Sequence, residues 1–138
     1  MNNLMKDKRG LVMGVANDKS IGWGIAKAIA DQGGELAFTY QGEALKKRVI
    51  PLADSVNSDI VLPCDVSNDE DIDDTFNELK KKWPKIDFLV HAIAFSDKDE
   101  LKGEYIDTSR ENFINTMDIS VYSFTAIARR ASVMMPDG

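Results

Sequence analysis

A glycine-containing turn is the first feature of this sequence with a chemical consequence. It runs from Gly14 to Gly24, at the end of the apolar segment 9–15. Gly14 permits a tight turn at the end of a strand, and the free N–H groups at a helix start bind phosphate oxygens. Ser20 lies at the expected helix start, where its hydroxyl caps the helix or meets a phosphate, and Gly22 and Gly24 let the helix approach the sheet or a ligand. The turn therefore predicts a pyrophosphate site, although its spacing is not G-x-G-x-x-G; a purely structural turn is the alternative.

Further polar positions follow the expected strands, at the edge where open α/β sheets bind ligands. Gln41 stands where an acidic residue usually holds the cofactor ribose, and its amide can bond the same hydroxyls; it can also be a plain loop residue. Asp65 either accepts from the adenine amino group or caps a turn before Ser67, while Val66 packs on the adenine ring. His91 is the only histidine, and without an acidic or nucleophilic neighbour in sequence it is interpreted as a packing residue rather than a catalytic base.

The residues after the second expected strand bear on the choice of cofactor. No arginine stands immediately there to meet the 2′-phosphate of NADPH, although Lys46, Lys47 and Arg48 follow on the next helix. We therefore expect NADH to be preferred over NADPH.

Short apolar segments alternate with amphipathic ones along the chain, which predicts a parallel sheet covered on both faces. The fold class is thus α/β, a Rossmann-like doubly wound parallel sheet with three α/β/α layers, of which the N-terminal half is present. Pro51 should break or kink the second helix. The sequences Ser67-x-x-Glu70 and Thr108-x-x-Glu111 are typical of capping boxes that start the last two helices. The expected strands are 9–15, 35–40, 59–64 and 86–91, and the expected helices are 20–32, 42–57, 67–83 and 108–135.

The last expected helix has an apolar stripe with the i, i+3, i+4 rhythm over about seven turns. Pro136 ends it. Because the second half of a doubly wound sheet is missing, we expect this stripe to lack the surface that should cover it. Its members are Phe113, Met117, Val121, Phe124, Ala128, Ala131 and Met135.

Composition narrows the function classes. The 138 residues carry a net charge of −6, which disfavours nucleic acid and anionic membranes as partners. No apolar segment approaches the roughly 20 residues that span a bilayer, and the N-terminal apolar run is too short for a signal peptide, so we expect a cytoplasmic protein. The single cysteine, Cys64, ends an apolar run and is interpreted as a buried, inert thiol. No metal site is expected.

Five motifs together resemble the divergent short-chain dehydrogenase/reductase family, and within it the enoyl-acyl-carrier-protein reductase branch of type II fatty acid synthesis. The resemblance extends from about Lys8 to the end of the chain. The serine in place of the second glycine of the turn, and His-Ala-Ile-Ala-Phe where ordinary members have Asn-Asn-Ala-Gly, favour this branch. The motifs are Gly14-x5-Ser20-Ile21, residues 37–41, Asp65-Val66, residues 90–95 and residues 118–123.

The resemblance implies NADH-dependent reduction of the trans-2 double bond of an enoyl chain carried by acyl carrier protein. It also implies a homo-oligomer, a tetramer in the family. Ser96 falls where the family contacts the acyl substrate, and Ser120 replaces the helix asparagine that relays protons in ordinary members. By the same resemblance, the residues lining the cofactor would be Gly14, Ser20, Ile21, Gln41, Asp65, Val66 and Ile93.

The catalytic Tyr-x6-Lys pair of the family has no acceptable match here. Only Tyr40, with Lys47, has the right spacing, and it lies at the adenosine end of the expected site. We therefore expect residues 1–138 to form a single dinucleotide-binding domain, truncated at its C-terminal end and inactive by itself, with the catalytic pair beyond it. Two alternatives remain: another short-chain reductase that acts on a carbonyl, or a non-catalytic dinucleotide sensor.

Overall fold

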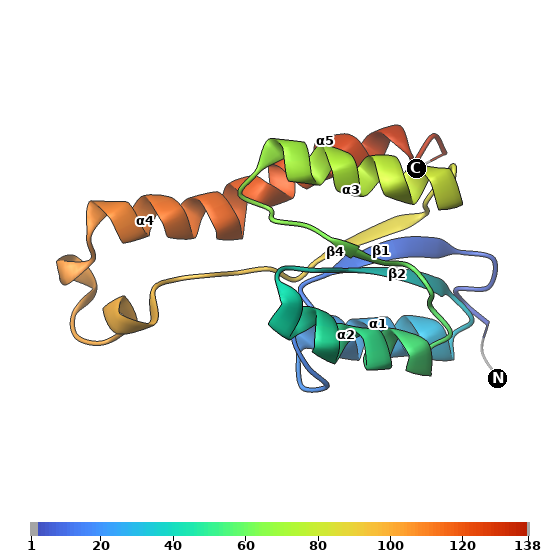
Figure 1. Ribbon diagram of the computed structural model, residues 1–138, viewed down its shortest axis with the longest axis horizontal. Coiled ribbons are helices and arrows are strands. Elements are labelled where there is room, and N and C mark those ends of the chain that lie inside the picture. Colours follow the sequence, from blue (N-terminus) through green and yellow to red (C-terminus); the bar gives the residue numbers. More distant parts are fainter. Residues whose placement is uncertain (1–2, 138) are drawn as a thin grey trace.

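The protein forms a four-stranded parallel sheet, with the strands in the order β3-β2-β1-β4. The computed structural model describes residues 3–137. β1 lies in the middle and pairs with β2 on one side and β4 on the other, so the expected parallel sheet is confirmed (Figure 1). Three of the strands are shorter than expected. Their bounds are β1 Arg9–Met13, β2 Glu35–Tyr40, β3 Val61–Pro63 and β4 Phe88–His91.

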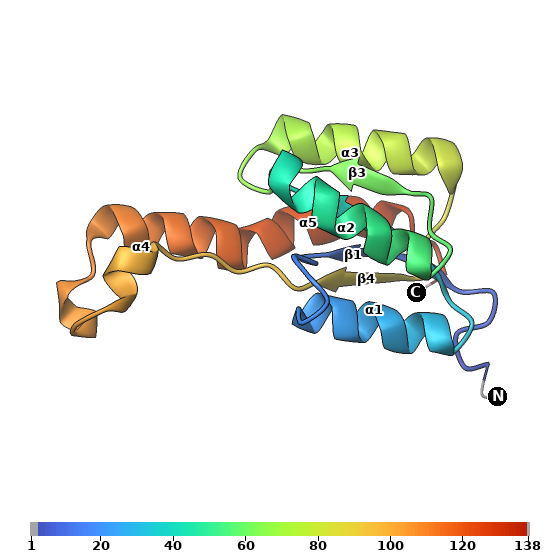
Figure 2. The ribbon, with the colours of Figure 1, turned by 60° about the horizontal axis from the view of Figure 1, so that its bottom comes forward.

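Helices cover both faces of the sheet, as a doubly wound fold requires (Figure 2). One face carries α1 (Ile21–Asp31) and α2 (Glu43–Ser55), and the other carries α3 (Asp69–Lys82) and α5 (Ser123–Val133). Beyond the end of the sheet, α4 (Arg110–Met117) extends away from the body of the molecule together with the chain that follows β4 (Figure 1). That connecting chain contains two short 3₁₀ helices, Lys98–Leu101 and Tyr105–Asp107. No helix in residues 3–137 has the length and apolar character to cross a bilayer.

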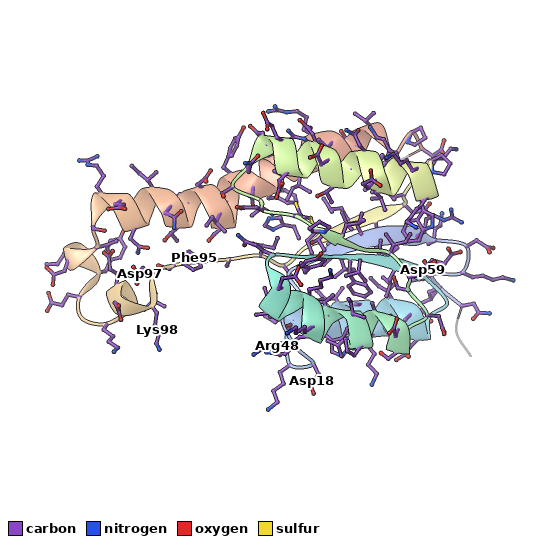
Figure 3. The ribbon with its side chains drawn as sticks, in the orientation of Figure 1. Asp18, Arg48, Asp59, Phe95, Asp97 and Lys98 are labelled. Carbon is purple, nitrogen blue, oxygen red and sulfur yellow. The ribbon has the colours of Figure 1, made fainter. Side chains whose placement is uncertain are left out.

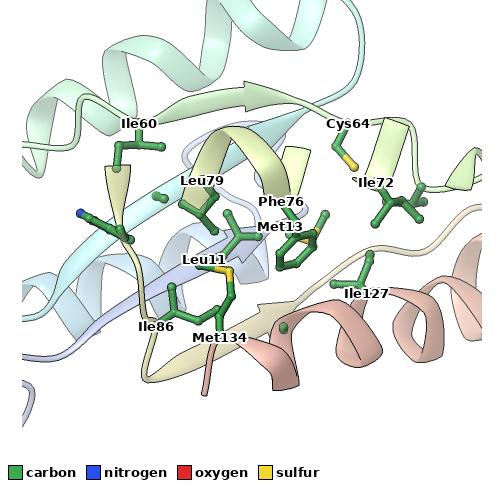
Figure 4. Packing of buried hydrophobic residues seen from close by; sticks show 14 of the residues in the cluster. Leu11, Met13, Ile60, Cys64, Ile72, Phe76, Leu79, Ile86, Ile127 and Met134 are labelled. Atoms are coloured by element: carbon green, nitrogen blue, oxygen red, sulfur yellow. The ribbon is translucent and has the colours of Figure 1, made fainter. Parts of the chain in front are cut away.

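Alternation along the central strand divides the core into two clusters. Leu11 and Met13 pack with α3 and α5, whereas Val12 packs with α1 and α2. All three side chains are fully buried, because β1 has a helical layer on each face. Figure 4 shows the first cluster, in which Phe76 of α3 and Ile127 of α5 lie among the residues packed over the sheet. Side chains that point alternately to the two faces of β1 thus pack the helical layers against the sheet.

Both expected capping boxes are wrong by one residue. α3 begins after Asn68, whose side chain accepts a hydrogen bond from the Asp71 N–H at 3.1 Å. The Ser67 hydroxyl instead donates to Asp65 at 2.6 Å, which removes it from the capping role.

α4 is likewise capped by Ser109 rather than Thr108. The Ser109 hydroxyl oxygen accepts from the Asn112 N–H at 3.1 Å and donates to Glu100 at 2.7 Å. The Thr108 hydroxyl turns back to the Tyr105 carbonyl at 2.7 Å. At both helices the hydroxyl expected to cap the helix donates instead to an acceptor earlier in the chain.

Pro51 does not break the second helix, which continues as α2 to Ser55. Pro51 lacks the N–H that would bond one turn back, a loss that costs a helix interior about 3 kcal/mol. The flanking residues Val49 and Ala53 are fully buried in the cluster beneath α2. Their burial keeps the helix in register across the proline.

The single long helix expected for residues 108–135 is divided. A π-helical turn, Asp118–Tyr122, joins α4 to α5. The inward face differs from the expected stripe: Phe113, Met117, Val121 and Phe124 are exposed, and the buried residues of α5 include Ala126 and Ile127. Of the expected stripe only Ala131 is buried, with Ala128 and Met135 half-buried.

We predict that Leu79→Ala lowers the free energy of unfolding of the intact protein by about 2–5 kcal/mol, because Leu79 is fully buried and a cavity would remain. The matched control is Leu4→Ala, since Leu4 is 79% exposed, and its effect should stay within about 0.5 kcal/mol. Denaturant unfolding monitored by circular dichroism measures both. Equal losses for the two variants would contradict the assigned core.

Candidate functional site

A cavity of about 260 Å³ lies at the carboxyl ends of the strands. Among its lining residues are Gly14 after β1, Gln41 after β2 and Val66 after β3. Ile93, after β4, completes the set, so four of the expected cofactor residues meet in one place. This is the edge at which parallel sheets bind ligands, because every strand points its carboxyl end toward it.

The turn after β1 approaches the chain after β4 too closely for a side chain. Gly14 has φ +102°, and a Cβ there would lie 2.0 Å from the Ala92 carbonyl oxygen. A Cβ at Gly22 would lie 3.3 Å from the Ala92 Cβ, which is a tight contact. A Cβ at Gly24 would meet nothing within 4 Å, so packing against the protein does not require that glycine. Gly14 is therefore a positional requirement of this edge of the sheet.

Ser20 shapes the turn itself. Its hydroxyl oxygen accepts from the N–H groups of Ala16 and Asn17, at 2.9 and 3.0 Å, and makes no side-chain cap on α1. With both lone pairs occupied, its hydroxyl proton is left to donate to a ligand oxygen. Ile21 is 81% exposed, and its backbone N–H is one of the first-turn donors of α1 without an intrahelical partner.

Asp65 closes a turn, the second of the two roles considered for it. One carboxylate oxygen accepts from both the N–H and the hydroxyl of Ser67, at 2.9 and 2.6 Å, and the Asp65 N–H donates to Asp71 at 2.9 Å. Val66 beside it lines the cavity. The other carboxylate oxygen of Asp65 is not part of this turn, so a contact with a ligand amino group stays a prediction.

His91 is hydrogen-bonded within the protein, in agreement with its interpretation as a packing residue. Its Nε2 lies 2.7 Å from the hydroxyl of the fully buried Ser123, which in turn donates to the Ile119 carbonyl at 2.6 Å. Ser123 therefore accepts from His91, which places the ring proton on Nε2. The Phe124 ring stands edge-on to the imidazole at 5.5 Å. Burial lowers the pKa of His91, so the neutral ring is favoured.

The π-helical turn fixes the chain that leaves β4. The Ser120 hydroxyl accepts from the Phe95 N–H at 3.0 Å and donates to the Phe95 carbonyl at 3.1 Å. Figure 3 shows Phe95 on the segment that joins the sheet to the projecting part of the chain. Ile119, next to Ser120, and Phe95 both line the cavity. Helix widening of this kind is frequent at functional sites.

Ser96, expected to contact substrate, lies just outside the cavity wall. Its hydroxyl oxygen is 3.1 Å from Asn112 Nδ2 and 3.2 Å from Thr116 Oγ1, both on α4. Sequence reasoning missed these two partners. The available signal was a polar pair with i, i+4 spacing beside the apolar stripe, which places both side chains on one helix face.

Other cavity residues also escaped the sequence argument. Leu45 of α2 and Ile119 of the π-helical turn reach the cavity from elements outside the expected strand ends. Cys64, expected to be a buried thiol, is buried as expected and also lines the cavity; burial raises its pKa. Tyr40 lines it too, with the Lys46 ammonium 5.8 Å from its ring centroid.

Comparison with known proteins gives consistent matches over this whole region. The family model described as Enoyl-(Acyl carrier protein) reductase matches residues 14–138. The chain is 62% identical, over its full length, to Enoyl-[acyl-carrier-protein] reductase [NADH] 2 of Rhizobium meliloti (strain 1021), of which it covers 52%. It is 51% identical over 135 residues to the enzyme named Enoyl-[acyl-carrier-protein] reductase [NADH] FabI of Rickettsia bellii, again covering 52%. The chain thus spans about half the length of the curated relatives it matches.

Solved structures give the same result. FabI from Candidatus Liberibacter asiaticus superposes with a TM-score of 0.97 at 55% identity, over 99% of this chain and 53% of that one. The enoyl-acyl-carrier-protein reductase of Anaplasma phagocytophilum, solved in complex with NAD, gives a TM-score of 0.96 at 54% identity, over 100% and 53%. The Bacillus cereus reductase, solved with NADP⁺ and an indole naphthyridinone, gives 0.95 at 45% identity, over 100% and 54%.

We predict that Gly14→Ala lowers the free energy of unfolding by about 1–3 kcal/mol, because the methyl group would collide with the Ala92 carbonyl and alanine disfavours positive φ. Gly24→Ala is the matched control. It lies within α1 with open space beside it, and should stabilise the protein by about 0.5–1 kcal/mol. Thermal unfolding of the two variants against the parent measures the difference. Destabilisation of similar size at both positions would count against the close approach.

The buried imidazole predicts a pH dependence of stability. The folded-state pKa of His91 is below its usual value of 6.5, so the unfolded chain binds the proton first as the pH falls. The stability due to the neutral ring is complete above pH 6.5 and is lost as the pH falls through the lowered pKa. Unfolding free energies measured from about pH 8 to about pH 5 should therefore decline less steeply for His91→Gln than for the parent. An equally steep decline would assign the effect to another group.

Proposed function

Since this chain belongs to the enoyl-(acyl-carrier-protein) reductase family, we propose that the whole protein containing it reduces the trans-2 double bond of enoyl-acyl-carrier-protein in fatty acid biosynthesis. The observation that carries the proposal is the 62% identity to a curated NADH-dependent reductase along the full length of this chain. The cavity at the strand ends adds independent physical support, because it combines a phosphate-binding turn with apolar walls.

The residues present fit a dinucleotide. A Cβ at Gly14 would reach the Ala92 carbonyl, so the glycine keeps the backbone of the turn bare beside the cavity. We propose that the first-turn N–H groups at Ile21 and the hydroxyl proton of Ser20 bind the pyrophosphate. Ile93 lines the same cavity from the end of β4, where we place the nicotinamide half of the cofactor.

We place the adenosine half of the cofactor at the ends of β2 and β3. In this proposal the Gln41 amide bonds the ribose hydroxyls, Asp65 accepts from the adenine amino group and Val66 packs on the ring. Gln41 and Val66 support it by lining the cavity. The neutral Gln41 offers no charge to a 2′-phosphate, which favours NADH, whereas Lys46 above the Tyr40 ring leaves one cation near this end.

The chemistry divides between this chain and the rest of the protein. NADH, when bound, supplies the hydride that the enoyl chain accepts. The residues of this chain bind and orient the cofactor, and the tyrosine and lysine that stabilise the developing charge lie beyond residue 138 in our proposal. The 138-residue chain alone is then inactive.

We propose further that the intact protein is a homo-oligomer, a tetramer as the family resemblance implies. The exposed apolar side chains along α4 and the π-helical turn support this, because side chains of this size rarely gather on a free surface. They include Phe113, Ile114, Met117, Val121 and Phe124. The cytoplasmic location expected from composition stays a prediction.

We predict that the intact protein oxidises NADH when given a crotonyl thioester, and does so more efficiently than it oxidises NADPH. The loss of absorbance of NADH, and in a separate assay of NADPH, with time measures the two rates. The isolated 138-residue chain should show no turnover under the same conditions, since it contains no acceptable Tyr-x6-Lys pair. An intact protein that reduces simple ketones but no enoyl thioester would favour the carbonyl reductase instead, and one that binds NADH without turnover of either would favour the sensor.

A further inference from the structure

His91 is the last residue of β4, and its ring joins the sheet to the helix that follows the π-helical turn. Its backbone pairs in register with Met13 of β1, so the ring is anchored to the central strand. Its Nε2 donates at 2.7 Å to the hydroxyl of Ser123, the first residue of α5, which is fully buried and away from competing water. Neither residue lines the cavity at the strand ends, so any effect they have on a ligand there acts through a neighbour.

The π-helical turn before Ser123 takes the usual partner away from one backbone carbonyl. In an α-helix the Ser123 N–H would bond the Ile119 carbonyl, four residues back. Here it bonds the Asp118 carbonyl, five residues back, as the widened turn requires. The Ile119 carbonyl accepts instead from the Ser123 hydroxyl, at 2.6 Å. The serine side chain therefore supplies a partner where the widening of the helix removes one.

His91 fixes the direction of that hydroxyl. A serine hydroxyl carries one proton, and this proton is used on the Ile119 carbonyl. The imidazole is then the donor to the hydroxyl oxygen, and with its N–H pointing there the hydroxyl cannot turn to donate to the ring. The Phe124 ring, edge-on to the imidazole at 5.5 Å, packs beside it. A donor anchored in the sheet thus keeps Ser123 bonded to the π-helical turn.

The π-helical turn in its present form places one wall of the cavity. Ile119 lines the cavity, and Ser120 bonds the N–H and the carbonyl of Phe95, which lines it as well. Figure 1 shows α4 and α5 continuing one another across the turn, and Figure 3 shows Phe95 where the chain leaves the sheet. A return to α-helical bonding shifts the register by one residue, which rotates Ile119 and Ser120 about the helix axis by roughly 100°. Both contacts with the cavity wall would then be lost.

We propose that His91 and Ser123 are positioning residues for the cofactor: the pair holds the π-helical turn, and through it the Ile119 and Phe95 wall against which NADH binds. This inference rests on the proposed function and gives a role to the only histidine of the sequence. His91 needs no acid–base step for this role, because it acts as a hydrogen-bond donor through Ser123 and does not reach the cavity.

The test uses the intact protein and KM for NADH, measured with a saturating crotonyl thioester. His91→Leu removes the donor, and Ser123→Ala removes the hydroxyl. Each should raise KM for NADH about 3- to 10-fold, the size expected for one lost hydrogen bond, with little change in kcat. His91→Gln, whose amide nitrogen can donate from a similar place, should restore most of the parent KM. When Ser123→Ala is already present, His91→Leu should raise KM no further, because His91 acts through that hydroxyl.

Ser58→Ala is the control matched for burial. Ser58 is 7% exposed and donates to the carbonyl of Leu36, and both residues line a separate hollow. This variant should lower the free energy of unfolding much as Ser123→Ala does, and leave KM for NADH unchanged. Ser132→Ala, which removes an exposed hydroxyl bonded to the Arg129 carbonyl within α5, should change neither quantity. The two controls separate a loss of stability from a displaced cavity wall.

Three results overturn the inference alone, in a parent that oxidises NADH: an unchanged KM in both single variants, a rise of the same size in Ser58→Ala, or effects of His91→Leu and Ser123→Ala that add in the double variant. Ser123→Ala and its control test the proposal even if His91→Leu folds poorly. A parent that oxidises no NADH with the crotonyl thioester would overturn the proposed function, and this inference with it.

Discussion

The close approach of Gly14 to the Ala92 carbonyl is the constraint on which the rest of the site depends. It brings the turn after β1 against the chain after β4, so the ends of these two neighbouring strands meet without a side chain between them. Ser20, just before α1, is tied to this region because its hydroxyl accepts from the N–H of Ala16, which lines the cavity. A larger residue at position 14 would separate β1 from β4 and displace both walls of the cavity.

The second half of the site is held by hydrogen bonds rather than by apolar packing. The inward face from α4 to α5 presents Asn112, Thr116, Ser120 and Ser123, which bond the chain after β4 or the His91 ring at its end. The chain after β4 leaves the sheet, so its backbone N–H and C=O groups lack partners on a neighbouring strand. Polar side chains of the adjacent helices supply hydrogen-bond partners to them. The large apolar side chains of α4, Phe113, Ile114 and Met117, consequently face outward.

These two halves differ in what brings their residues together. The half at the strand ends joins residues through contacts that follow directly from parallel pairing. The other half joins Phe95 to Ser120 and Ser96 to Asn112 across the projecting segment, and each link depends on the phase of a helix that contains a π-helical turn. The geometry of the cavity is thus set by the sheet, and the geometry around Ser96 by that helix.

The sequence by itself determined the layered fold, the edge of the sheet that carries the cavity, and the places of Gly14, Gln41 and Val66 there, because parallel order brings the strand ends together. Ile93 was expected there from the family resemblance. Only the tertiary structure decided the helix starts, the continuity of α2 through Pro51 and the inward face of the last helix. At the helix starts a nearby acceptor prevailed, since Asp65, two residues away, took the Ser67 hydroxyl. In the other two cases a partner distant in sequence prevailed, because the core held Val49 and Ala53 and the backbone after β4 drew polar side chains inward. Sequence patterns indicate which structure a segment prefers by itself. The helix starts, the course of α2 and the inward face of the last helix depended instead on the hydrogen-bond acceptor or packing surface next to each segment in the fold.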